Sequence, residues 1–154
     1  MKILAIDPGP TESAYVLLDG ERICLKGKEP NEAMRDITFA LCDADIVAIE
    51  KIASYGMAVG AEVFETCVWT GRFIERMTIR DPILTRLRRI PRGDVKMHLC
   101  KSMRAKDGNI RQALIDRLGA PGTKKSPGAT YGVSADIWAA LAVGITALDK
   151  ERGL

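Results

Sequence analysis

The chain has 154 residues, of which 47% are apolar and 28% charged, and its formal net charge is +3. This length and composition predict one folded domain, residues 1–154, and disfavour a disordered chain. The small net charge conceals an asymmetry. Residues 72–125 hold 15 of the 23 basic and 5 of the 20 acidic residues, so this segment carries +10 and the remainder −7. A basic segment on an acidic chain favours a polyanionic partner, although basic stretches are often only solvated surface.

Several other classes of protein are disfavoured. The apolar run at the N-terminus, MKILAID, is too short and too soon interrupted for a signal peptide or a membrane span. The only histidine, His98, lacks the partners that a zinc site or a serine-based triad needs. The cysteines form no CxxC pair, which predicts reduced, buried thiols in a cytoplasmic protein at Cys24, Cys42, Cys67 and Cys100.

The first half of the chain predicts a hairpin followed by alternating helices and strands. Strands are expected at Lys2–Asp7, Glu12–Asp19, Glu21–Lys28 and Asp45–Ile52, and helices at residues 31–43 and Ala61–Met77. Asp19-Gly20 is a strong hairpin signal, and Pro30 is typical of a helix start. The wholly apolar Ile46–Ile49 predicts an interior strand.

The second half predicts one further strand and two helical segments. Leu84–Ile90 alternates apolar and basic residues, as an edge strand would, and Arg92–Leu118 is expected to be mostly helical. A Gly- and Pro-rich loop at residues 119–132 precedes a final helix, Ala135–Lys150, which we expect Ser134 to cap. The order β-β-β-α-β-α-β-α-α predicts an α/β fold with a mixed sheet of five strands and helices on both faces.

Three carboxylates lie in or at the ends of apolar segments. Asp7 and Glu50 each end a predicted strand, and Asp136 falls in the first turn of the last helix. If the two strands are adjacent and parallel, Asp7 and Glu50 emerge at the same sheet edge, and the final helix can bring Asp136 there. Three converging acids repel one another, and Mg²⁺, which prefers oxygen ligands, would relieve that repulsion.

Each acid also has a purely structural interpretation. Asp7 is placed to cap the PGP turn, Glu50 to pair with Lys51 or a nearby arginine, and Asp136 to favour the helix dipole. The occurrence of all three beside a basic segment favours a metal site. The chemistry this suggests is phosphodiester hydrolysis by two metal ions held ~3.5–4 Å apart.

The sequence resembles the RuvC family of Holliday-junction resolvases, which have a ribonuclease H-like fold. The resemblance covers nearly the whole chain and is carried by ILAIDPGP, IVAIEKI, KMHLCKSMRAKDGNIRQALIDRL and SADIWAALAVGITAL. The short form, with TKKSPGATYGVS before the last helix, is similar to phage-borne members, which implies location in a host cytoplasm. The resemblance implies a crossover junction endodeoxyribonuclease, which is a homodimer that nicks four-way DNA symmetrically. It also implies two Mg²⁺ ions per active site, for which Mn²⁺ can substitute, and no nucleotide cofactor. Asp7, Glu50 and Asp136 are then the catalytic metal ligands.

One departure from the family pattern affects the metal site. The family has a second acid three residues after the first on the final helix, and Ala139 occupies that position here. Residues three apart share a helix face, so its absence predicts weaker metal affinity, with activity retained. A shifted register, with Asp136 itself in the fourth role, remains open.

The resemblance also indicates residues that contact DNA. The basic stretch before the last helix is expected to contact phosphates through Lys96, Lys101, Arg104, Lys106, Lys124 and Lys125. The arginines Arg86, Arg88 and Arg89 are interpreted as a solvated strand face. Tyr55 falls where the family inserts a side chain at the junction centre, and two interpretations are even: stacking on an unpaired base, or packing on the adjacent helix. Trp69 and Trp138 are expected in the core or in a dimer interface.

Other functions compete with junction cleavage. The DPGPT segment also resembles the phosphate-binding loop of actin-like sugar kinases, but those need two such domains. A branched-DNA-binding protein with little or no catalysis is the more serious rival, since three acids are evident where the family has four. A third option is a related nuclease acting on flaps or other branched DNA.

Overall fold

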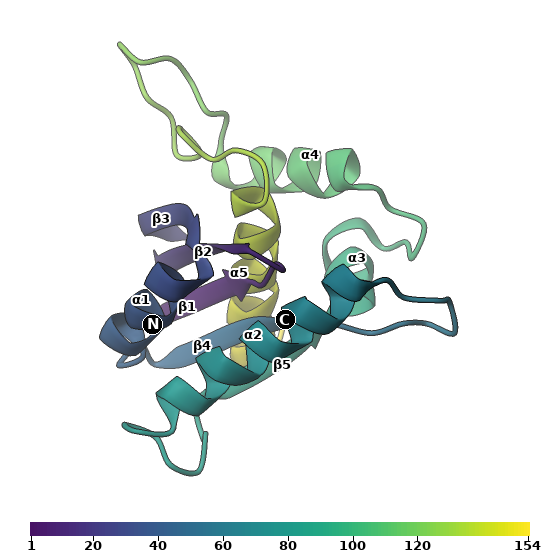
Figure 1. The fold of residues 1–154 in the computed structure, drawn as a ribbon. Helices are drawn as coiled ribbons and strands as arrows, with labels where there is room; N and C mark the ends of the chain where they lie inside the picture. The colour runs from purple at the N-terminus through teal and green to yellow at the C-terminus, as the bar shows by residue number, and fades with distance from the viewer.

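The computed structural model describes all 154 residues as a five-stranded sheet flanked by five helices (Figure 1). The strands are β1 (Lys2–Asp7), β2 (Glu12–Asp19), β3 (Arg22–Pro30), β4 (Ile46–Lys51) and β5 (Leu87–Pro91). The helices are α1 (Asn31–Leu41), α2 (Ala61–Met77), α3 (Arg92–Cys100), α4 (Asp107–Leu118) and α5 (Ile137–Arg152). The predicted α/β class and the mixed five-stranded sheet are therefore confirmed.

The sheet has the order β3-β2-β1-β4-β5. β1 pairs antiparallel with β2 and parallel with β4, and β5 pairs parallel with β4 at the edge. The apolar runs of β1 and β4 are buried because helices cover both faces, as expected for interior strands.

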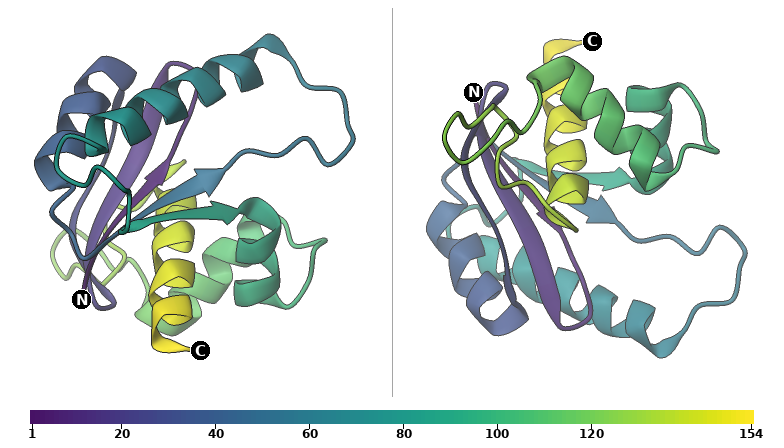
Figure 2. Two further views of the ribbon diagram at one scale, coloured as in Figure 1. Left: turned by 90° about the horizontal axis from the view of Figure 1, so that it is seen from below. Right: turned by 90° about the horizontal axis from the view of Figure 1, so that it is seen from above.

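Two helical layers cover the sheet (Figure 2). α1 and α2 pack on one face, where Met34 and Phe73 are fully buried against β1 and β4. α5 lies on the other face, and α3 and α4 pack beside it. α5 is apolar on nearly all sides, which suits a buried helix. Its Gly144 permits close approach to the sheet, since a Cβ there would lie 3.0 Å from that of Ala5.

The segment Arg92–Leu118 is mostly helical, as predicted, but it forms two helices where the predicted element order has one. α3 ends where Lys101 adopts a left-handed conformation (φ 56°), and α4 begins only at Asp107. The strand predicted from Leu84 begins at Leu87, because Leu84 also has a positive φ and the Asp81 carboxylate accepts a hydrogen bond from the Arg86 amide.

The start of the last helix and the cysteines also differ from expectation. α5 begins at Ile137, so Ser134 does not cap it, and Asp136 occupies the N-cap position instead of the first turn. All four cysteines are free as expected, but Cys24 and Cys67 are exposed, so the prediction that every thiol is buried was wrong. None of the helices has the length and apolar character needed to cross a membrane.

Candidate active site

The sheet places Asp7 and Glu50 side by side. Ile6 of β1 pairs with Ile49 of β4 in parallel register, so the next residue of each strand is one of the two acids. Alternation along β1 puts Asp7 on the same face as Ala5, which belongs to the core beneath α5. Both acids therefore lie at the carboxyl edge of the sheet, on the face that α5 covers.

Asp136 reaches this edge from the start of α5. Ala135, the preceding residue, has a φ of 44°, a left-handed conformation that costs an ordinary residue about 1–2 kcal/mol. The turn is maintained because α5 packs along β1 immediately after it. The structure thus brings the three predicted acids into one electrostatic cluster.

Burial and mutual repulsion perturb this cluster. The pKa of Asp7 is raised to about 8, first by burial and then by the charges of Glu50 and Asp136. Burial also raises the pKa of Glu50, against the opposing charge of Arg92. Asp7 makes no ion pair, so near neutral pH it is held largely protonated until a cation compensates its charge.

Two basic side chains pair with the other two acids. The Lys28 ammonium on β3 lies 2.7 Å from Asp136 Oδ2, and the Arg92 guanidinium at the start of α3 lies 3.3 Å from Glu50 Oε2. Arg92 also pairs with Asp107 at the start of α4. Lys28 was not predicted from the sequence. Its signal was the hairpin register, which places Lys28 opposite Ala14 and Ala14 opposite Asp7.

The donor chemistry of the cluster fits a hard divalent cation. Three carboxylates supply only oxygen atoms, and Asp7 makes no ion pair, although the charges of Arg92 and Lys28 oppose the rise of its pKa. No group of His, Cys, Asp and Glu side chains forms a ready-made ligand set in this conformation, and two of the three acids are paired with Lys28 and Arg92. Asp7, Glu50 and Asp136 are therefore the residues that would hold the metal, after release from these ion pairs.

A small cavity adjoins Asp136 where the expected fourth acid is missing. Its volume is about 60 Å³, and its lining includes Arg92, Asp107, Asp136, Trp138 and Ala139. Ala139 is half-buried and contributes only a methyl group. The cavity leaves room for a carboxylate there.

Ala139→Asp should lower the Mg²⁺ concentration that half-maximal DNA cleavage requires by about tenfold, because it adds an oxygen ligand beside Asp136. The measurement is a Mg²⁺ titration of cleavage rate, with Ala129→Asp, which adds the same charge in an exposed loop, as control. An unchanged metal dependence would show that the missing acid does not limit metal binding.

The predicted DNA contacts lie at different distances from the acids. Lys96 on α3 is close, since its charge lowers the pKa of Glu50 and its side chain lines a cavity of about 310 Å³ with Arg92. The exposed turn between α3 and α4 carries Lys101, Arg104 and Lys106. Lys124 and Lys125 are exposed on the loop before α5, which projects from the body (Figure 1). No contact links these two lysines with the acids.

Tyr55 lies beside the same 310 Å³ cavity. Its hydroxyl accepts a hydrogen bond from the Gly93 amide at 3.2 Å, yet 61% of the residue is exposed. A Cβ at Gly93 would come within 2.7 Å of Met103 Cε and 3.3 Å of the Tyr55 hydroxyl, so glycine lets both side chains lie close to the start of α3. The ring is therefore held by α3 and still accessible.

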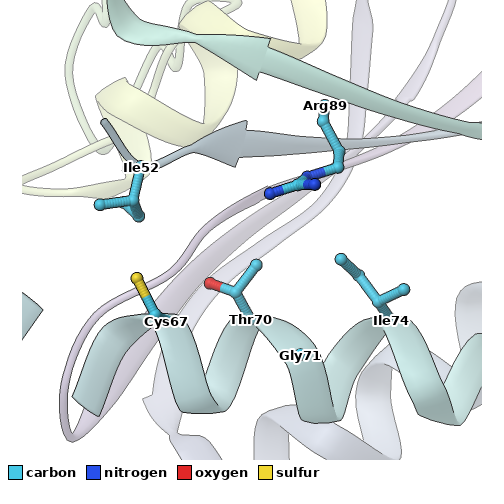
Figure 3. A pocket seen from close by; sticks show the side chains of 6 residues that line it. All are labelled: Ile52, Cys67, Thr70, Gly71, Ile74 and Arg89. Atoms are coloured by element: carbon cyan, nitrogen blue, oxygen red, sulfur yellow. The ribbon is translucent and has the colours of Figure 1, made fainter. Parts of the chain in front are cut away.

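A separate cavity of about 240 Å³ lies on the other face of the sheet (Figure 3). Ile52 and Arg89 point from the strand side toward Cys67, Thr70 and Ile74 of α2. It contains none of the three carboxylates and is not part of the candidate site.

Comparison with known proteins identifies the fold. The sequence matches no protein-family model and no curated protein. A solved structure of Thermus thermophilus RuvC superposes with a TM-score of 0.69 at 18% identity, covering 99% of this chain and 97% of that one. The chain has the RuvC fold. A second structure, T. thermophilus RuvC in complex with Holliday junction substrate, gives a TM-score of 0.67 at 17% identity, covering 99% and 96% of the two chains. The resemblance inferred from the motifs is thus confirmed at the level of the fold, which in RuvC is ribonuclease H-like.

Proposed function

We propose that this protein is a structure-specific endonuclease that resolves four-way DNA junctions by divalent-metal-dependent phosphodiester hydrolysis. The observation that carries the proposal is the cluster of Asp7, Glu50 and Asp136 at one sheet edge of a RuvC fold. The solved RuvC complex with Holliday junction substrate supports the choice of branched DNA. Basic residues close to the acids, above all Lys96, supply the charge that a phosphate backbone requires.

The acidic and the basic side chains of this site have different proposed roles. Asp7, Glu50 and Asp136 would hold the metal, with two ions supplying activation of water and stabilisation of the leaving oxygen when bound. Half-burial of Asp7 and Glu50 excludes part of the surrounding water and strengthens their electrostatic interactions. Lys96 is placed to hold the phosphate beside Glu50, and the more distant lysines fix the DNA register without reading its sequence.

The test is cleavage of matched four-way, three-way and flap substrates with Mg²⁺ or Mn²⁺. We expect the four-way junction to be cut fastest, and Asp7→Asn to cut none of them. Preference for the flap would assign the protein to the related nucleases. Tight junction binding without cutting under either metal would favour a protein that binds branched DNA without cleaving it. This is the second candidate function, because Ala139 stands in place of the fourth acid and because Lys28 and Arg92 pair with two of the other three.

A homodimer is part of the proposal, because paired nicks need two active sites. α2 exposes Phe64, Cys67, Val68 and Gly71 at the spacing of one helix face. The side chains of Phe64 and Val68 leave a largely apolar stripe, and Gly71 permits a second helix to approach closely. We propose that this stripe meets its equivalent in a second copy.

Val68→Glu should convert the dimer into a monomer and abolish coordinated second-strand nicking, because it places two charges in an apolar contact. Sedimentation equilibrium measures the first effect. Leu25→Glu is the matched control, since Leu25 on edge strand β3 is equally exposed, at 48%. Cys67 offers a second test: a short bis-maleimide should link two chains through it, and a dimer that persists in Val68→Glu would move the interface elsewhere.

Tyr55→Ala should reduce distortion at the centre of the junction, because the accessible ring is proposed to stack on an unpaired base for ~1–3 kcal/mol. Fluorescence of 2-aminopurine at the crossover measures this. Tyr55→Phe keeps the ring but loses the hydrogen bond from Gly93, so it should retain most of the distortion. Normal distortion in the alanine variant would show that Tyr55 does not stack on a base, and its only contact role would then be the hydrogen bond with Gly93 of α3.

A further inference from the structure

Lys28 and Arg92 are the two basic side chains that form ion pairs with the acids of the site, and they come from opposite sides of it. Lys28 extends from β3 and Arg92 from the start of α3, whereas the acids lie on β1, β4 and the start of α5. Each pairs with a different acid, Asp136 or Glu50. The three carboxylates are thus balanced in part by two positive charges.

The position of Lys28 indicates more than an incidental surface pair. Ala14 separates it from Asp7 across the sheet, and a methyl group leaves the path to the site open. Lys28 lies 2.7 Å from Asp136 and 3.6 Å from Glu12, so a second carboxylate is available if Asp136 is withdrawn. Its side chain is 34% exposed, which allows movement toward the solvent side of the site.

Arg92 has a similar choice of partners. It contacts Glu50, whose side chain is 12% exposed, and Asp107, whose side chain is 87% exposed. It also lines both cavities beside the site, that of Asp136 and that of Lys96 and Tyr55. Loss of the Glu50 contact would leave Arg92 anchored by Asp107, beside the cavity that it lines with Lys96 and Tyr55.

We propose that Lys28 and Arg92 are internal counter-ions which a divalent cation displaces from Asp136 and Glu50, and which then bind a phosphate of the DNA next to the cut. Lys28 and Arg92 occupy lone pairs of Asp136 Oδ2 and Glu50 Oε2, and their charges oppose a second cation, so they compete with a metal for these oxygens. The released cations gain a new anionic partner when DNA arrives. Metal and DNA binding therefore promote each other, and the DNA half of this inference rests on the proposed function.

The first test measures Mn²⁺ binding without DNA, by calorimetry. Lys28→Met and Arg92→Met should each bind Mn²⁺ at least about fivefold more tightly than the wild type, because a competitor for the carboxylates is gone. Lys26→Met, two positions from Lys28 on β3, and Arg89→Met, on β5 just before α3, are the controls: each loses the same charge nearby, and neither residue forms an ion pair in the structure. Lys28→Arg should restore wild-type affinity.

The second test measures junction affinity by fluorescence anisotropy with and without Ca²⁺. Wild-type affinity should rise at least about fivefold with Ca²⁺, and that rise should fall below about twofold in Lys28→Met and Arg92→Met. Circular dichroism establishes that each variant is folded, with Lys28→Gln and Arg92→Gln as second variants.

Each outcome bears on a separate half of the inference. Unchanged or weaker Mn²⁺ binding in both methionine variants, or none in any protein, overturns the displacement. If Mn²⁺ binds more tightly but Ca²⁺ still raises junction affinity as much as in the wild type, then the released Lys28 and Arg92 do not bind a DNA phosphate. Failure of every variant and the wild type to bind junctions refutes the proposed function, while the Mn²⁺ result still decides whether the counter-ions compete with metal.

Discussion

Asp7→Asn should abolish junction cleavage while making the metal-free protein more stable. Loss of cutting is expected to be at least about 10³-fold, as is usual when one member of a catalytic unit is removed. Asn keeps the shape of Asp but cannot supply the charge that compensates a metal ion. Junction binding should persist, because the basic residues of α3 and of the turn that follows it are unchanged.

The gain in stability follows from the raised pKa of Asp7. In the folded protein that pKa is about 8, against an ordinary value of 3.8. Between these values the folded state binds the proton more tightly than the unfolded state, so stability from this group is fully present below about pH 4 and declines as pH rises to 8. At pH 8 Asp7→Asn avoids the buried charge and should be more stable by about 1–2 kcal/mol.

Urea unfolding at pH 5 and pH 8 measures this effect. The difference between variant and wild type should grow from pH 5 to pH 8, and Mg²⁺ should stabilise the wild type more than Asp7→Asn. Asp36→Asn, on the exposed face of α1, is the control and should show neither effect. A variant less stable than the wild type at pH 8 would mean that Asp7 is already compensated in the absence of metal.

The sequence predicted the central part of the site because its signals are local. KILAID and IVAIEK are apolar runs that each carry an acid at or next to the end. A strand that is apolar on both faces is expected in the interior of a sheet that helices cover on both sides. Interior parallel strands expose their ends at one edge, so adjacency of β1 and β4 was enough to bring Asp7 and Glu50 together. The role of these acids in catalysis stays a prediction.

The parts that were missed depend on contacts between distant segments. Whether Lys28 meets Asp136 depends on how α5 is placed over β3, which no local pattern encodes. The break between α3 and α4 depends on the left-handed Lys101, although lysine has no preference for that conformation. Ser134 resembles a helix cap, but the packing of α5 against β1 begins the helix three residues later.

A second group of charges, far from the site, ties three helices together. Asp149 near the end of α5 is 3% exposed and accepts two hydrogen bonds from Arg117 of α4, at 2.6 and 2.8 Å. His98 of α3 lies 2.6 Å from the same carboxylate, and Arg117 continues to the exposed Glu21. These contacts lower the pKa of Asp149 to about 2 and satisfy a charge that would otherwise be costly to bury.

Asp149→Ala should destabilise the protein by about 3 kcal/mol, the lower end for a broken buried ion pair, because Arg117 stays partly exposed. That corresponds to a fall in Tm of about 6–12 °C. In the wild type the contribution is fully present above pH 3.8 and is lost as pH falls through about 2, so the two proteins should converge in acid. Thermal unfolding at pH 7 and at pH 2 measures both expectations.

The same variant separates the stability of the fold from the chemistry of the site. Asp149 lies 13 residues after Asp136, roughly 20 Å along the helix, so junction cutting well below the Tm should be unchanged. Glu21→Gln, which removes the exposed partner of Arg117, should cost less than about 1 kcal/mol. A loss of Mg²⁺ affinity in folded Asp149→Ala would contradict this separation, and would mean that the far end of α5 controls how Asp136 is presented to the metal.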